Sequence, residues 1–124
     1  MYDPVVTLQR ISKTYSRAGT DVSVLRDLSF TIPAGTFLAI MGPSGSGKST
    51  LLNVMAGIDR PTSGSVVVAG TRLDDLSEGD MARWRARHIG YVFQSYNLIP
   101  VLTASENVEL PLLLTHLSRQ ERRE

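Results

Sequence analysis

The glycine-rich stretch Gly42–Ser49 constrains the fold of this 124-residue chain more than any other part of its sequence. It reads GPSGSGKS and fits the pattern G-x-x-x-x-G-K-S/T of a phosphate-binding P-loop. Such a loop lies between a strand and a helix, because its backbone N–H groups and the positive end of the helix dipole must converge on one anion. The motif therefore predicts an α/β fold with a strand before Gly42 and a helix after Gly47.

The residues on both sides of the loop meet this requirement. Thr36–Met41 is an apolar run without alternation, as expected for a strand that is covered on both faces of a parallel sheet. A helix is expected from Lys48 to about Ala56. It is apolar nearly all round, which predicts burial, and Gly57 follows where a left-handed C-terminal cap belongs.

The residue types of the loop suit a purine nucleoside triphosphate with magnesium, Mg²⁺. Glycines let the backbone approach phosphate oxygens without Cβ clashes, Lys48 can reach the β- and γ-phosphates, and the Ser49 hydroxyl can ligate magnesium. A Gly/Ser-rich surface loop that matches by chance is disfavoured by the strand-and-helix context. The predicted nucleotide-binding residues are Gly42, Pro43, Ser44, Gly45, Ser46, Gly47, Lys48, Ser49 and Thr50, with Lys48 also catalytic and Ser49 a metal ligand.

Turn residues and hydrophobic patterns divide the rest of the chain. Residues 1–35 and 62–76 are predicted to be mainly antiparallel β-structure, 36–60 the P-loop strand and helix, 88–94 a further strand, and 95–124 the start of a helical part. Within them we expect strands at Val5–Ile11, Val22–Leu25, Leu28–Ile32 and His88–Phe93, and a hairpin about Gly70.

Three pairs with capping-box spacing predict helix starts. Ser77 with Asp80 begins a helix to about Arg87, Thr103 with Glu106 begins one that Pro111 disturbs, and Ser118 with Glu121 begins a third. Only three residues follow Glu121, whereas an isolated helix needs about 12–15. We therefore expect that the sequence has been cut within a longer domain.

Composition excludes several classes of protein. Thirteen Lys and Arg against twelve Asp and Glu give no basic excess, so a nucleic-acid partner is not expected. The absence of cysteine excludes disulfides and thiolate metal sites. No stretch reaches the roughly 20 apolar residues of a membrane-spanning helix. Contact with a membrane would therefore come through a partner.

Three motifs in order give the chain a family resemblance. Gly42–Leu52, which reads GPSGSGKSTLL, closely resembles the ATPases of ABC transporters, as does the Pro61–Gly64 turn after it. Arg87–Gln94, RHIGYVFQ, is similar to the strand that leads into that family's Q-loop. Beyond these three motifs, the stretch Ser95–Leu112 looks like the subgroup that powers lipoprotein release and macrolide export, the LolD/MacB type. The resemblance covers essentially the whole chain.

This resemblance implies a P-loop ABC ATPase core with an N-terminal antiparallel β-subdomain. Tyr15 would stack on adenine, and Gln94 would contact magnesium and the attacking water, as a catalytic and metal-binding residue. Ser95–Glu109 would meet a transmembrane permease subunit, and a second ATPase domain would form a head-to-tail dimer. The protein would be cytoplasmic, at the inner face of the membrane. The residues alone leave alternatives open. Tyr15 could be a core aromatic, and Gln94 an ordinary polar residue. Four apolar side chains could belong to the core: Leu98, Ile99, Val101 and Leu102.

The family's second half is missing from the sequence. It holds no LSGGQ-type signature and no apolar strand that ends in Asp-Glu. Hydrolysis needs a group that orients or deprotonates water, usually a carboxylate. A transport ATPase is therefore expected of the intact family member, and this stretch alone is expected to be inactive. The alternative is a non-hydrolytic nucleotide-binding module. A nucleotide kinase is disfavoured, because the Pro61–Gly64 turn and the Gln94 context have no role in one.

Overall fold

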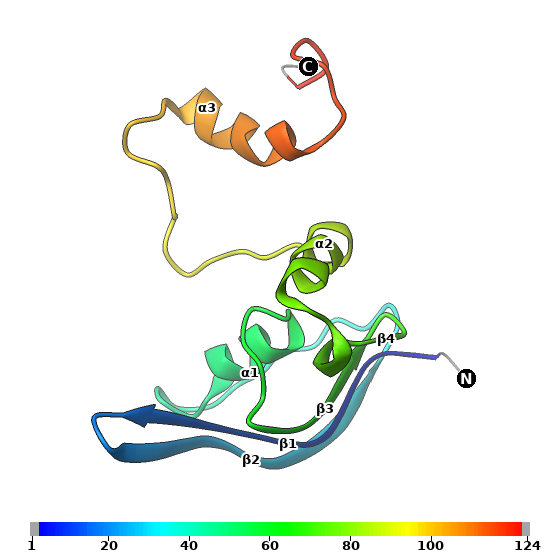
Figure 1. The fold of residues 1–124 in the computed structure, drawn as a ribbon, viewed down its shortest axis with the longest axis vertical. Helices are drawn as coiled ribbons and strands as arrows, with labels where there is room; N and C mark the ends of the chain where they lie inside the picture. The colour runs from blue at the N-terminus through cyan, green and yellow to red at the C-terminus, as the bar shows by residue number, and fades with distance from the viewer. Residues whose placement is uncertain (1–2, 123–124) are drawn as a thin grey trace. The chain divides into compact units, whose positions relative to one another are not determined.

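The computed structural model describes residues 3–122, which fall into two compact units that divide between Tyr91 and Val92. The first unit contains a four-stranded antiparallel sheet in the order β2-β1-β3-β4 (Figure 1). Its strands are β1 (Pro4–Arg17), β2 (Thr20–Pro33), β3 (Ser63–Val68) and β4 (Thr71–Arg72). The predicted antiparallel β-structure before the P-loop and after its helix is confirmed. The two segments expected at 22–25 and 28–32 form one strand.

Two tight turns build the sheet. Ala18 and Gly19 join β1 to β2 with φ of 48° and 79°, and Ala69 and Gly70 join β3 to β4 with φ of 48° and 74°. Positive φ at both central residues is the type I′ pattern, whose twist matches that of paired strands. The predicted hairpin about Gly70 is therefore confirmed.

Strand β1 contains a bulge that sets which side chains face the core. Its pairing with both neighbouring strands shifts between Leu8 and Ser12, and Arg10 has a φ of 50°. Side chains of a regular strand alternate between faces, so Leu8 and Ile11 would point to opposite sides without an extra residue. With the bulge, both are buried, at 1% and 0% exposure. The face of Ile11 then continues through Lys13 and Tyr15.

The helices of the first unit are α1 (Lys48–Met55), the 3₁₀ turn η1 (Leu73–Asp75) and α2 (Glu78–His88). In Figure 1, α1 lies over one face of the sheet. Residues of all three elements join the strands in one apolar core, which comprises Leu8, Ile11, Leu25, Leu51, Val54, Val66, Val68, Leu73, Met81 and Trp84.

The start of α1 at Lys48 agrees with the sequence, and Gly57 has the predicted left-handed backbone, with φ of 65°. The expectation that α1 is buried nearly all round is wrong. Leu51 and Val54 are buried, but Leu52 is 45% exposed. The core described above contacts only one side of the helix, which leaves the side of Leu52 uncovered.

The predicted helix starts have different outcomes. Ser77 accepts from the Asp80 N–H at 3.2 Å and caps α2. Thr103 and Glu106 form a complete capping box at α3 (Ala104–Glu109), and Pro111 lies in the 3₁₀ segment η2 (Leu110–Leu114) that follows. Ser118 and Glu121 exchange two hydrogen bonds, at 2.8 and 3.4 Å, yet the residues described up to 122 form only a turn there.

The predicted strands Thr36–Met41 and His88–Phe93 are corrected by the structure. Both segments are irregular, apart from His88, which ends α2. Phe37, Met41 and Val92 are 98%, 89% and 97% exposed. An apolar run becomes a strand only when a neighbour pairs with its N–H and C=O groups, and the strands of the described residues pair among themselves. Residues 3–122 also contain no helix that is both long and apolar enough to cross a membrane.

Candidate nucleotide-binding site

The P-loop joins α1 through a glycine that no other residue could replace without strain. Gly47 has a φ of 90°, and a Cβ there would lie 3.1 Å from the Val24 carbonyl oxygen and from the Leu25 side chain. The loop can therefore lie directly against β2. Within the described structure no side chain caps the start of α1. Its first-turn N–H groups are thus not taken by a side chain, as an anion site at a helix N-terminus requires.

The loop curls around the ammonium group of Lys48. Lys48 Nζ donates to the carbonyl oxygens of Gly42 and Pro43 at 2.8 and 2.7 Å and lies 3.3 Å from Ser46 Oγ. A hollow of about 420 Å³ opens beside it, lined by Val24–Arg26 and Leu28 of β2 and by Ile40–Pro43, Ser46–Lys48 and Leu51. Phosphate oxygens entering this hollow would meet a full positive charge, which carbonyl dipoles satisfy only partly.

The donor set suits a magnesium ion that arrives with the nucleotide. Residues 3–122 contain no cluster of three His, Cys, Asp or Glu side chains that could hold a metal. Mg²⁺ commonly keeps several waters and takes few protein ligands together with substrate phosphates. The exposed Ser49 hydroxyl, one residue beyond Lys48, fits that mode of binding.

Tyr15 lies beside the first turn of α1. Its hydroxyl donates to Asp59 Oδ2 at 2.6 Å and lies close to the Thr50 side chain, and the residue is 39% exposed. The hydrogen bond to Asp59, with some burial, raises the pKa of Tyr15. Partial burial acts to raise the pKa of Asp59, but hydrogen bonds from Lys13, Tyr15 and the Arg60 N–H outweigh it and hold that pKa below its usual value. The structure thus brings Tyr15 and Thr50 together and leaves part of Tyr15 accessible.

Gln94 belongs to the second unit, where it is exposed at a bend. Its contact with magnesium and water stays a prediction.

In the second unit the side chain of Asn107 holds the loop before α3 through several hydrogen bonds. Its Oδ1 accepts from the Ile99 N–H at 2.7 Å, and its Nδ2 donates to the carbonyls of Ile99, Leu102 and Thr103 at 3.0–3.2 Å. The loop so fixed exposes apolar side chains: Tyr96 (94%), Leu98 (63%) and Val101 (89%).

Sequence reasoning missed Lys13, Asp59 and Asn107. Lys13 and Asp59 contact each other across 46 positions, and Asn107 contacts a loop up to eight positions away. No local pattern marks such pairs. The only hint for Asp59 is its place two residues after the Gly57 cap. The hint is weak, because an acidic side chain at such a place can equally well face solvent.

The sequence matches the ABC transporter family over residues 25–124. The chain belongs to the ABC transporter family. It is 45% identical over 120 residues to the ABC transporter ATP-binding protein YvrO of Bacillus subtilis, covering 97% of this chain and 52% of that protein. It is 43% identical over its whole length to the macrolide export ATP-binding/permease protein MacB of Burkholderia pseudomallei, of which it covers 19%.

A solved structure shows the same fold. The ATP-binding cassette MJ0796, a protein of Methanocaldococcus jannaschii, determined as a dimer in a post-hydrolysis state with ADP and Pi, matches with a TM-score of 0.88 and 44% identity. The match covers 95% of this chain and 52% of that one. The chain therefore has the fold of an ABC ATPase cassette, and it spans about half the length of YvrO and MJ0796.

The Lys48 contacts generate a prediction. Lys48→Ala should weaken MgATP binding by this protein about ten- to a hundredfold, since a hydrogen bond to a charged group contributes about 1.5–3 kcal/mol. Isothermal titration measures it. Arg17→Ala, which removes an exposed cation at the end of β1, is the matched control and should leave the dissociation constant unchanged. Equal affinity of wild type and Lys48→Ala would contradict the role of Lys48.

Proposed function

We propose that this chain is part of the ATP-binding subunit of an ABC transporter and couples MgATP binding and hydrolysis to a membrane permease that exports or releases a substrate. The observation that carries the proposal is the loop Gly42–Ser49, folded around the Lys48 ammonium at the uncapped start of α1. This arrangement combines a fixed charge, free helix N–H groups and an approachable backbone, the three elements of a phosphate cradle.

The residues have separate roles in this proposal. Lys48 neutralises the β- and γ-phosphates, Ser49 ligates the magnesium that the nucleotide brings, and Tyr15 stacks on the base. Gln94 contacts magnesium and the attacking water. Support for Tyr15 comes from its partial exposure and its place close to Thr50, only two positions after Lys48.

Hydrolysis is proposed for the whole protein. The 124 residues include no Asp-Glu pair after an apolar strand, and a water-activating carboxylate is needed. The relatives YvrO and MJ0796 are about twice as long as this chain, and we place the missing acidic strand in that further length. The second candidate is a non-hydrolytic nucleotide-binding module, in which the loop around Lys48 would bind phosphates without a hydrolysis step.

The proposed partners are a permease and a second ATPase domain. MacB of Burkholderia pseudomallei is named as an ATP-binding and permease protein, and MJ0796 was solved as a dimer. We propose that the protein is cytoplasmic, at the inner face of the membrane. We also propose the division into a β-subdomain (1–35 and 62–76), a P-loop part (36–60), a Q-loop segment (88–94) and the start of a helical subdomain (95–124).

The permease would bind at Ser95–Glu109. Asn107 holds the loop in one shape before any partner arrives, so little conformational entropy is lost on binding, and the exposed Leu98 and Val101 offer apolar area.

Leu98→Asp should weaken the permease complex about tenfold or more, because a charge buried in an apolar interface costs several kcal/mol. Nucleotide affinity should not change, and permease-stimulated ATP turnover should fall. Leu114→Asp is the matched control, since Leu114 is 92% exposed in the same unit but lies outside this surface. Loss of ATP binding in Leu98→Asp would instead mean that Leu98 belongs to a core.

The irregular segment 36–41 leads to a prediction for residues 1–124 taken alone. With Phe37 and Met41 exposed and no water-activating carboxylate, they should aggregate or melt over a broad range and release phosphate from ATP only at the rate of the no-enzyme background. Calorimetry and a phosphate-release assay measure both properties. A sharp cooperative melt together with steady turnover would contradict both parts of this prediction.

A further inference from the structure

We propose that Asp59 is a positioning residue for the nucleotide base: with Lys13 it holds the ring of Tyr15 at the start of the P-loop helix, in the orientation that a purine stacks on. This inference rests on the proposed function, that is, on ATP binding at Gly42–Thr50. It adds that ATP binding requires the hydroxyl of Tyr15. Stacking by an aromatic ring alone would not require that group.

The two carboxylate oxygens of Asp59 bind different groups of β1. Oδ2 accepts from the Tyr15 hydroxyl at 2.6 Å, and Oδ1 accepts from Lys13 Nζ at 2.7 Å. Lys13 and Tyr15 are two positions apart and lie on the same face of the strand. One carboxylate therefore fixes both the tip of the aromatic side chain and the cation beside it.

Lys13 occupies one face of the Tyr15 ring. Its Nζ lies 4.7 Å from the ring centroid and also donates to the Arg60 carbonyl at 2.7 Å. The ammonium is thus held by Asp59 and Arg60, and its side chain is only 13% exposed. Because this cation covers one face of the ring, the opposite face is the one on which a base can stack.

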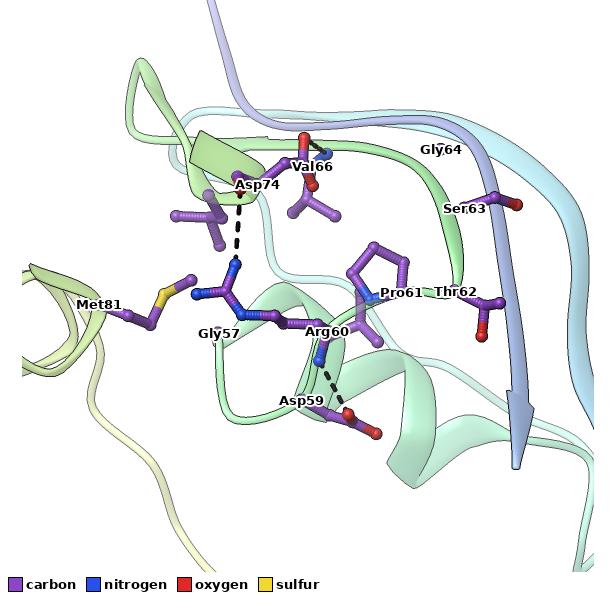
Figure 2. A pocket seen from close by; sticks show the side chains of 12 residues that line it. Gly57, Asp59, Arg60, Pro61, Thr62, Ser63, Gly64, Val66, Asp74 and Met81 are labelled. Carbon is purple, nitrogen blue, oxygen red and sulfur yellow. Dashed lines mark hydrogen bonds between the residues drawn. The ribbon is translucent and has the colours of Figure 1, made fainter. Parts of the chain in front are cut away.

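Asp59 can position Tyr15 because the loop that contains Asp59 is itself fixed by hydrogen bonds to other parts of the first unit. Figure 2 shows Asp59 and Arg60 with their side chains pointing in different directions, that of Arg60 toward Asp74. The Arg60 guanidinium donates to the Leu76 carbonyl at 2.6 Å and to Glu78 Oε1 at 3.0 Å. The Asp59 N–H donates to the Asn53 carbonyl at 3.1 Å, which ties the loop to α1.

The hydroxyl of Tyr15 is consequently tied to the loop that follows α1. It donates to Asp59, which lies beyond the helix end. A phenyl ring without the hydroxyl lacks this bond and can rotate away. Tyr15→Phe therefore reports the positioning, while Tyr15→Ala would report only the loss of the ring.

The experiment separates base binding from phosphate binding in the full-length protein that contains this chain. Isothermal titration gives dissociation constants for MgATP and for magnesium tripolyphosphate, which lacks the base. Asp59→Asn and Tyr15→Phe should each weaken ATP binding about three- to tenfold, the range for one stacked aromatic contact, and leave tripolyphosphate binding unchanged. The double variant should be no weaker than Tyr15→Phe alone. Glu78→Gln is the matched control, because Glu78 is also acidic and pairs with Arg60, the neighbour of Asp59. This variant should bind ATP as wild type does.

The possible outcomes distinguish failure of this inference from failure of the proposed function. A wild-type protein that binds neither ligand contradicts the proposed function, and the inference falls with it. If Asp59→Asn weakens both ligands equally, Asp59 has only a structural role and the inference is overturned while ATP binding stands. If Asp59→Asn does not fold, Tyr15→Phe alone decides the test, because it removes only one oxygen atom. The proposal would be overturned if Tyr15→Phe prefers ATP over tripolyphosphate as strongly as wild type does.

Discussion

The extra residue in β1 is the constraint on which the rest of the first unit depends. The bulge with Arg10 at a φ of 50° turns Ile11 into the core beside Leu8. It is held by side chains as well as by backbone, because the Arg10 N–H donates to Ser29 Oγ at 2.8 Å. Without it every side chain beyond Arg10 would face the opposite side, and Lys13 and Tyr15 would point away from α1. A backbone irregularity thus decides where the candidate base contact lies.

The candidate site is consequently assembled from contacts that are distant in sequence. Tyr15 comes from β1, Thr50 from α1 and Asp59 from the loop after α1, and the core side chains Ile11, Leu51 and Val54 hold the two elements together. A hydrogen bond to a charged group such as the Asp59 carboxylate contributes about 1.5–3 kcal/mol, so these contacts are strong enough to hold a side chain in place. Their effect is geometric: they fix a partly exposed ring that packing alone would leave free to turn.

What could be predicted from the sequence was local. The P-loop helix, the cap at Ser77, the capping box at Thr103 and the hairpin at Gly70 each depend on residues a few positions apart, and all four are confirmed. The strands expected at Thr36–Met41 and His88–Phe93 depend on neighbours that the described residues do not supply. The Lys13–Asp59 contact could not be predicted, because it follows from a bulge that no residue pattern in β1 marks. The role of Gly42–Thr50 rests on the P-loop motif, those of Tyr15 and Gln94 rest on the resemblance, and all of them stay predictions.

The two ends of the P-loop are held very differently, and this links folding to nucleotide binding. At the helix end, Gly47 lies against β2, and Leu51 and Val54 are buried in the core. At the strand end, Ile40 packs against that core, while Phe37 and Met41 on either side are exposed. A loop anchored firmly at one end loses more conformational entropy when it closes on phosphates than one anchored at both ends. Whatever strands pair with residues 36–41 would therefore strengthen ATP binding without touching the nucleotide, by fixing the loop beforehand.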